Sequence, residues 1–259
     1  MQAFYSRGES YLALKKYDKA LIDFEKVIEK GNSEYYVVSL DKAAIIAYHH
    51  SNAFAQAYTY YSKLEKVART EDKQFQAQLG ALRSAHRSQN QDGVAEYAVK
   101  VANNPKSSAD EKALSNYYLG KLNYDRNDLG KASEYFTKAL KGGENEQTAE
   151  SRYMLAKIYY DQEKWDEAEQ ACNTAIEGNS GFPYWIAKSL LLISDTQVKK
   201  SDYFNARAAL EAVVENFEGD KALVDEAKKK LKELDQIEGK LNRVNLKTNE
   251  SKTLEMEEN

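Results

Sequence analysis

The sequence predicts an all-α solenoid of six helix pairs and one terminal helix, and three observations lead to this fold class. A short apolar motif headed by a small residue recurs six times, at Ala20, Ala57, Val94, Ala132, Ala168 and Ala206. The successive spacings are 37, 37, 38, 36 and 38 residues, and a regular period of about 20–50 residues is the signature of repeat architectures. The chain also has only 2 Pro and 12 Gly, too few to separate many short strands.

Each copy of the motif belongs to a pair of amphipathic segments. Apolar residues recur at helical spacing in both segments, as at Ala20, Phe24 and Val27 in the second segment of the first copy. The small residue lets the two helices of a pair approach at the short end of the range of about 8–10 Å between helix axes. We expect one repeat domain over residues 1–241, with repeats at 1–34, 38–71, 75–104, 109–142, 148–179 and 184–217.

Several local signals predict where helices begin and end. Ser108 and Glu111 form a capping-box pattern at the start of the fourth pair, and Pro183 suits the first turn of a helix. Asn52, Asn127 and Ser201 are expected to cap the second helices of their pairs. Residues 223–241 form a Lys- and Glu-rich amphipathic pattern that predicts a capping helix, and residues 242–259 are expected to be a disordered acidic tail.

Composition and charge exclude several classes of protein. The 259 residues contain no apolar run near the roughly 18–20 residues of a membrane-spanning helix. One Cys cannot support a disulfide framework or a multi-thiolate zinc site. The net charge of -4 argues against sequence-independent binding of nucleic acid.

The first copy resembles the tetratricopeptide repeat (TPR). Phe4, Gly8, Tyr11, Ala20 and Phe24 fall on the family pattern W-x₂-L-G-x₂-Y…A-x₃-F. The match is close in copies one, four and five, is looser in the others, and covers residues 1–217. The resemblance implies a right-handed α-solenoid superhelix of about six TPR-like helix-turn-helix repeats with a C-terminal capping helix.

The family resemblance also carries expectations about place and partner. The period near 37 exceeds the usual repeat of about 34 residues, and the longer turns resemble those of TPR proteins of Gram-negative envelopes. This implies a periplasmic or envelope-associated location if the chain is part of a longer exported protein, and a cytoplasmic one otherwise. Tyr5 and Glu9 stand where the chaperone carboxylate clamp of the family has Lys and Asn, so recognition of a chaperone C-terminus is not expected.

The sequence predicts no catalytic residues, no metal site and no cofactor. His49 and His50 are adjacent and therefore point about 100° apart on a helix, which does not suit a pair of metal ligands. Cys172 replaces the aromatic residue of the repeat pattern and is expected to be a small core residue. Gly142-Gly143 precedes Glu144 rather than Lys and Ser/Thr, which indicates a turn and not a phosphate-binding loop.

A duplicated stretch supplies the candidate partner-binding residues. Residues 117–125 and 153–161 share Tyr, Lys, Tyr and Asp at matching positions 36 residues apart. Within each copy the Tyr, Lys and Tyr lie at i, i+4 and i+7, on the helix face that lines the concave groove of TPR arrays. The candidate ladder consists of Tyr117, Lys121, Tyr124, Tyr153, Lys157 and Tyr160, and copy six continues it with Asp195.

Two interpretations of this ladder remain open. The Tyr rings either pack between repeats with their hydroxyls in water, or they bind an extended or helical peptide together with the Lys charges. The function expected is a non-catalytic protein–protein interaction scaffold whose groove binds a segment of an unidentified protein or peptide. The alternative is a structural, self-associating section of a longer exported protein, which the start of copy one at residue 1 favours.

Overall fold

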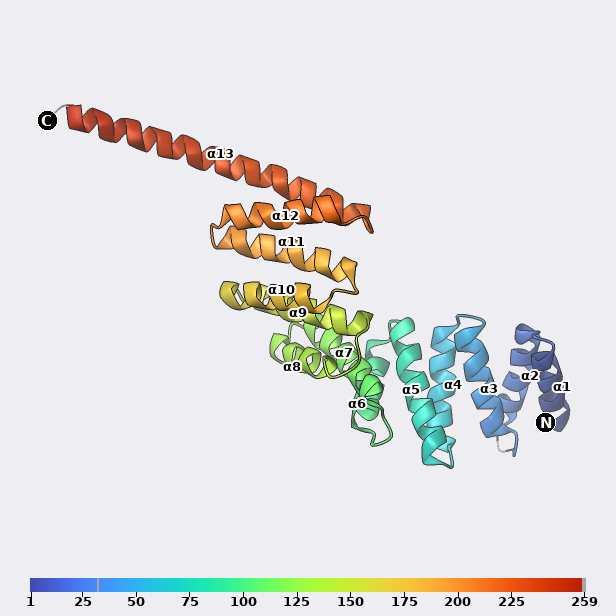
Figure 1. Ribbon diagram of the computed structural model, residues 1–259. Coiled ribbons are helices and arrows are strands. Elements are labelled where there is room, and N and C mark those ends of the chain that lie inside the picture. Colours follow the sequence, from blue (N-terminus) through green and yellow to red (C-terminus); the bar gives the residue numbers. More distant parts are fainter. Residues whose placement is uncertain (32, 258–259) are drawn as a thin grey trace. The chain divides into compact units, whose positions relative to one another are not determined.

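The computed structural model describes the backbone of residues 1–31 and 33–257 and the side chains of residues 1–31 and 33–240. Thirteen α-helices and no strand occur in these residues (Figure 1), which confirms the predicted fold class. The helices are α1 (Gln2–Ala13), α2 (Tyr17–Lys30), α3 (Tyr36–His49), α4 (Phe54–Val67), α5 (Glu71–Arg87), α6 (Gln91–Asn103), α7 (Ala109–Asp125), α8 (Leu129–Ala139), α9 (Glu146–Asp161), α10 (Trp165–Gly178), α11 (Pro183–Lys199), α12 (Tyr203–Asn216) and α13 (Lys221–Glu257).

The chain divides into two compact units, and the single repeat domain over residues 1–241 stays a prediction. Unit 1 is Met1–Gly143 and contains the four pairs α1–α8; unit 2 is Glu144–Asn259 and contains α9–α13. Within unit 1 each helix packs against the next one along the chain. In unit 2 the same order holds, and α11 also packs against α9 and α13.

The small residues of the motif lie in the core, as the helix-pair geometry requires. Ala20, Ala57, Ala132, Ala168 and Ala206 are fully buried and Val94 is nearly so. In the first and fourth pairs a glycine of the first helix faces a phenylalanine of the second. A Cβ on Gly8 would lie 2.9 Å from the Phe24 ring, and a Cβ on Gly120 would lie 2.8 Å from the Phe136 ring. The ring therefore occupies the space that a side chain would need.

The tight turn inside each pair contains one residue in the left-handed region, and these residues are not glycines. Their φ angles lie between 51° and 60°, at Lys15, Asn52, Gln89, Asn127, Glu163 and Ser201. The prediction that Asn52, Asn127 and Ser201 cap the second helices is wrong by one residue. Asp128 and Asp202 cap α8 and α12 through their carboxylates, and Ala53 precedes α4 without a side-chain cap. Asn tolerates the left-handed conformation better than most residues, which explains its place in two of these turns.

Other predicted helix starts are confirmed, with one shift. Ser108 and Glu111 form the complete capping box of α7, and Pro183 occupies the first turn of α11. The third pair begins at Glu71 rather than 75, because the Thr70 hydroxyl accepts a hydrogen bond from the Lys73 amide.

The last helix is longer than the sequence suggested. Its backbone remains helical to Glu257, whereas the capping helix was expected to end at 241 and residues 242–259 to be disordered. Residues 242–257 contain neither Gly nor Pro, so no residue type there breaks a helix. Residues 258–259 lie outside the described residues. No described helix is both long and apolar enough to cross a membrane.

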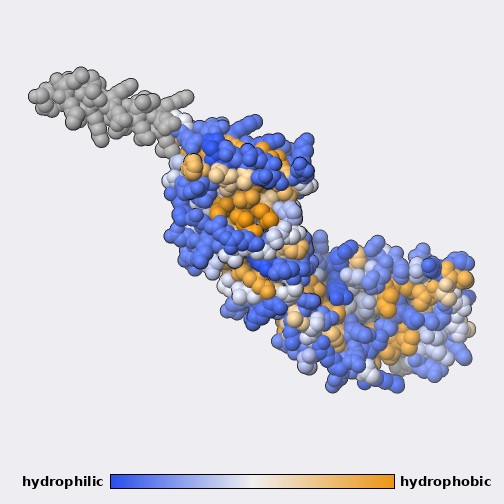
Figure 2. Space-filling model, in the orientation of Figure 1, coloured by the Kyte–Doolittle hydropathy of each residue, from blue (hydrophilic) through white to orange (hydrophobic). Residues whose placement is uncertain are grey.

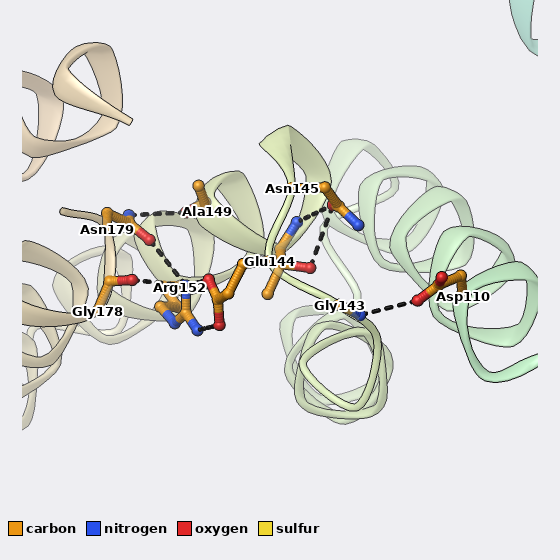
Figure 3. Close-up of polar contacts among 9 residues, drawn as sticks. Asp110, Gly143, Glu144, Asn145, Ala149, Arg152, Gly178 and Asn179 are labelled. Atoms are coloured by element: carbon orange, nitrogen blue, oxygen red, sulfur yellow. Dashed lines mark hydrogen bonds and ion pairs between the residues drawn. The ribbon is translucent and has the colours of Figure 1, made fainter. Parts of the chain in front are cut away.

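Polar contacts at the turns fix the starts of α7 and α9 (Figure 3). In unit 1 the Asp110 carboxylate accepts a hydrogen bond of 2.8 Å from the Gly143 amide. In unit 2 the Arg152 guanidinium donates to both carboxylate oxygens of Glu144, to the Gly178 carbonyl and to Asn179 Oδ1. These bonds tie the turn before α9 to the turn after α10.

Candidate functional site

The predicted ladder is divided between the two units, so each part is described within its own unit. Tyr117, Lys121 and Tyr124 lie on α7 of unit 1. Tyr117 is only 7% exposed, and its ring centroid lies 6.4 Å from that of Phe136. Lys121 Nζ lies 5.9 Å from the centre of the Tyr117 ring. Tyr117 is thus part of the core, and Lys121 extends from it toward the surface.

A pocket of about 300 Å³ opens beside α7 in unit 1. Tyr118, the residue after Tyr117, is one of its lining residues. The Tyr118 ring stacks on His86 of α5, with centroids 4.1 Å apart and planes 25° apart. The pocket is lined by His86, Gln89, Gln91, Val94, Tyr118, Lys121, Leu122 and Asp125. Lys121 is therefore the only member of the predicted set that lines it.

Two arginines of α5 give this face of unit 1 a positive character. Burial raises the pKa of Tyr118 to about 12, the nearby Tyr48 adds to the rise, and the charges of Arg83 and Arg87 oppose it. The Arg87 guanidinium lies 4.5 Å above the centre of the Phe54 ring. Within the part of the chain that the structure describes, neither arginine forms an ion pair. This face of unit 1 thus combines aromatic rings with the positive charges of two arginines.

Tyr153 of α9 has different neighbours in unit 2. It is half-buried against the cluster that contains Ala156 and Cys172. Its ring centroid lies 5.5 Å from that of Trp185, and Lys188 Nζ lies 5.6 Å from the centre of the Tyr153 ring. Burial raises the pKa of the Tyr153 hydroxyl, and nearby carboxylates on α11 and α13 raise it further. The hydroxyl is accordingly a neutral hydrogen-bonding group near neutral pH.

Lys157, Tyr160 and Asp195 are the remaining predicted residues of unit 2. Lys157 forms an ion pair with Asp161 and lies 5.5 Å from the centre of the Tyr160 ring. The Asp195 carboxylate of α11 accepts a hydrogen bond of 2.6 Å from Lys230 of α13. Burial raises the pKa of Tyr160, Asp195 adds to this rise, and Lys230 opposes it. The predicted residues of α9 and α11 therefore meet on one surface, and α13 contributes a lysine to it.

Comparisons with known proteins agree with the fold of repeated helix pairs. The profile of the family described as "Tetratricopeptide repeat" matches residues 2–32. The profile described as "Anaphase-promoting complex, cyclosome, subunit 3" matches residues 89–175. Together with the six helix pairs and their buried small residues, these matches decide the family. The chain is a tetratricopeptide-repeat protein. No curated protein sequence matches it.

Solved structures share the fold of this TPR protein at low sequence identity. The crystal structure of YrrB, described as "a TPR protein with an unusual peptide-binding site", has a TM-score of 0.56 and 19% identity, and the match covers 80% of this chain and 97% of YrrB. BtubC from P. vanneervenii gives 0.55 at 14% identity, covering 82% and 94% of the two chains. PilF of Pseudomonas aeruginosa gives 0.54 at 16% identity, covering 88% and 96%.

Sequence reasoning missed several residues at the site of this TPR protein. Tyr118, Lys188 and Lys230 lie beside the predicted residues but are not among them, and His86 was not paired with Tyr118. Tyr118 could have been predicted from the sequence. It follows Tyr117 directly, and adjacent residues lie on different faces of a helix, so two adjacent tyrosines indicate a second aromatic face. The contributions of Lys188 and Lys230 depend on how α11 and α13 pack and have no signature in the sequence.

Chemistry beyond binding has little support among the described residues. Burial raises the pKa of the Cys172 thiol to about 12, which makes it a poor nucleophile at neutral pH. Among the residues that the structure describes, no three His, Cys, Asp or Glu side chains are grouped to hold a metal ion.

Proposed function

We propose that this TPR protein is a non-catalytic scaffold whose inner face binds a segment of a partner protein. The observation that carries the proposal is the pocket beside α7, where Lys121 of the predicted ladder joins a stacked His86–Tyr118 pair. Rigid aromatic rings bury much area at low entropic cost, and a pocket of about 300 Å³ suits an anchoring side chain of a peptide. The peptide-binding site described for YrrB supports the same kind of function.

In this proposal the two units make different contributions. The inner face of unit 1 offers the rings of Tyr48 and Tyr118 near the charges of Arg83 and Arg87. We expect this face to favour peptides with aromatic and acidic side chains, because cations attract both carboxylates and the faces of rings. In unit 2 the charges already pair with one another, as Lys157 does with Asp161. We expect unit 2 to contribute Tyr153 and Tyr160 as hydrogen-bonding anchors.

The proposal is tested with peptides selected from a random peptide library on the whole protein. The dissociation constant of the best peptide is then measured for the wild type and for the double variant Lys121→Glu/Lys157→Glu. We expect binding to weaken about tenfold or more, because a charge reversal at the binding surface replaces attraction by repulsion.

The matched control is Lys16→Glu/Lys66→Glu, which makes the same charge change at two exposed lysines away from the ladder. It should bind as the wild type does, and circular dichroism should stay helical in both variants. Equal affinities of the two double variants would contradict the proposal.

Self-association is the second candidate, and an exposed apolar surface favours it. Figure 2 shows apolar residues gathered over α11. A pocket of about 220 Å³ is lined by residues of α11 and α12, among them Ile186 and Leu190, and by Phe217 after α12. Phe204 on α12 is also 81% exposed. Light scattering between low and high micromolar concentration separates the two candidates: dimers favour self-association, and a constant monomer mass favours the peptide scaffold. An envelope location is expected only within a longer exported chain, which export of a reporter fused to the full-length protein would test.

A further inference from the structure

A buried carboxylate network joins the second and third helix pairs of unit 1. Glu65 of α4, 7% exposed, accepts hydrogen bonds from Gln78, Tyr97 and Lys100 at 3.0, 2.9 and 3.0 Å. Lys100 Nζ also lies 4.5 Å from the centre of the Tyr97 ring. Burial acts to raise the pKa of Glu65, but the hydrogen bonds from Lys100, Gln78 and Tyr97 outweigh it and hold the pKa below its ordinary range. The carboxylate is therefore held ionised by three donors.

One helix pair later the donors recur but the carboxylate is missing. The repeat shifts by 37 residues from Ala57 to Val94 and by 38 from Val94 to Ala132. These shifts map Gln78, Tyr97 and Lys100 onto Asn116, Tyr135 and Lys138, whereas Glu65 maps onto Ala102. Lys138 Nζ lies 5.2 Å from the centre of the Tyr135 ring, which repeats the arrangement of Lys100 and Tyr97.

A pocket of about 440 Å³ occupies the place of the missing carboxylate. It is lined by Ala102, Ala109, Lys112, Ala113, Asn116, Lys138 and Lys141, and we refer to it as the lysine pocket. None of these lining residues is acidic, and within the described part of the chain its three lysines form no ion pair. Two acidic residues adjoin the lining residues in sequence. Asp110 accepts a hydrogen bond from the Gly143 amide through Oδ1 (Figure 3), and Glu111 accepts hydrogen bonds from the Ser108 amide and hydroxyl.

The lysine pocket is distinct from the inner-face site. At 100° per residue, Lys112 and Asn116 lie about 80–180° around α7 from Tyr117, Lys121 and Tyr124. Its setting is also electropositive. Residues 1–143 contain 21 Lys and Arg against 17 Asp and Glu, a net charge of +4, whereas residues 144–259 contain 16 against 24, a net charge of -8. An acidic ligand is therefore drawn to unit 1 by its overall charge as well as by the pocket.

We propose that the lysine pocket binds a carboxylate side chain from an acidic segment of a partner protein, which takes the place that Glu65 fills one pair earlier. The occupant is a carboxylate because the same donor types hold a carboxylate in the preceding pair. Phosphate is the weaker candidate, since the lining contains no arginine fork. The alanines leave room for the peptide backbone, and Lys112 and Lys141 can meet further carboxylates of the segment.

The experiment measures fluorescence anisotropy of a fluorescein-labelled hexaglutamate peptide on the full chain, with hexaglutamine as the uncharged peptide. We expect the wild type to bind hexaglutamate more tightly than hexaglutamine. Ala102→Glu restores the missing carboxylate inside the pocket and should weaken hexaglutamate binding about tenfold or more. The control Ala55→Glu adds the same charge at an exposed alanine of α4 and should change binding less than about twofold.

A second readout needs no peptide. If the donors around Ala102 are arranged for a carboxylate, Ala102→Glu should raise the midpoint of thermal unfolding, whereas Ala102→Gln and Ala55→Glu should not. Adding Lys138→Gln to Ala102→Glu should remove the gain. A fall of the midpoint in Ala102→Glu, with Ala102→Gln tolerated, would contradict the assignment of a carboxylate site.

The remaining outcomes are also decisive. Equal binding of the two peptides by the wild type, or equal weakening by Ala102→Glu and Ala55→Glu, would overturn the proposal. Displacement of hexaglutamate by inorganic phosphate at constant ionic strength would make the pocket a general anion site and overturn the carboxylate assignment. Because Ala102→Glu should leave binding of the library-selected peptide within about twofold, whereas Lys121→Glu/Lys157→Glu weakens it, failure of the inner-face site and failure of the lysine pocket are distinguishable.

Discussion

Helices α7 and α9 contain the same Tyr–Lys–Tyr–Asp pattern, yet their surroundings differ. In unit 1 Gly120 leaves space for the Phe136 ring, and Tyr117 packs near that ring and is 7% exposed. In unit 2 the matching positions are Ala156 and Cys172, both fully buried in one cluster, and Tyr153 is half-buried against Trp185.

The difference shows that a repeated sequence does not fix a repeated surface. A glycine paired with a large ring and an alanine paired with a small thiol fill similar space between two helices. Neighbouring helices then decide which side chains lie beside the pattern: α5 supplies His86 and two arginines in unit 1, and α11 and α13 supply Lys188 and Lys230 in unit 2. The shared pattern consequently lies beside the cationic surface around Tyr118 and Lys121 in unit 1 and beside paired charges in unit 2.

The largest expected effect comes from truncating the larger side chain in each of two matching core contacts, Gly120–Phe136 in unit 1 and Ala156–Cys172 in unit 2. Phe136→Ala should lower the free energy of unfolding by about 3–5 kcal/mol, because it leaves a cavity under Gly120 and Tyr117. Cys172→Ala removes one buried sulfur and should cost about 1 kcal/mol. Urea denaturation followed by circular dichroism measures both values, and equal losses would mean that the two pairs are packed alike.

A smaller effect tests the glycine itself. Gly120→Ala should destabilise the protein by about 1–3 kcal/mol, because the new Cβ would meet the Phe136 ring at 2.8 Å. The matched change Ala156→Gly should cost only about 0.5–1 kcal/mol, the usual cost of glycine inside a helix. Urea denaturation followed by circular dichroism measures both changes in the free energy of unfolding. If Gly120→Ala stabilised the protein, the tight contact between Gly120 and the Phe136 ring would be refuted.

The starts of α7 and α9 differ too, and the smallest expected effect, that of Glu144→Ala, comes from this region. Arg152→Ala should cost about 1–3 kcal/mol, because the Gly178 carbonyl and Asn179 Oδ1 lose a charged donor. Glu144→Ala should cost less than about 1 kcal/mol, since Glu144 is 61% exposed.

The stability difference between the wild type and Glu144→Ala should depend on pH. The hydrogen bond from Arg152 lowers the pKa of Glu144, so its contribution is complete above the ordinary Glu pKa of about 4.3 and is lost as pH falls through the lower folded value. The stability difference between wild type and Glu144→Ala, followed by urea denaturation across this range, should therefore shrink in acid. A difference that grows in acid would show that Glu144 is not held by Arg152.

Much of the fold follows from the sequence, because each repeat buries its own small residue. The spacing of Ala20 and its equivalents predicts the helix pairs, and these residues lie in the core. The caps at Asp128 and Asp202 were missed by one residue, since the turn needs a left-handed residue before the cap. No local signal in the sequence distinguishes such a residue from the cap when both are polar.

The candidate site was predictable only within single helices. The spacing of Tyr117, Lys121 and Tyr124 places them on one face of α7, but burial of Tyr117 depends on Phe136 of another helix. The lysine pocket combines three helices from two pairs. Such a site becomes visible only when the structure shows that Asn116 and Lys138, which match two of the three donors around Glu65, line a pocket together with Ala102.

Site-specific photocrosslinking tests the inner-face account most directly. A photoreactive phenylalanine analogue replaces Tyr124, Tyr160 or, as the control, Phe204, which is 81% exposed on α12. A peptide selected on the wild-type protein is added, and the crosslinked residues are identified by mass spectrometry. Crosslinks from positions 124 and 160 but not from 204 are the predicted result. Crosslinks from 204 alone, or equally from all three positions, would contradict the account.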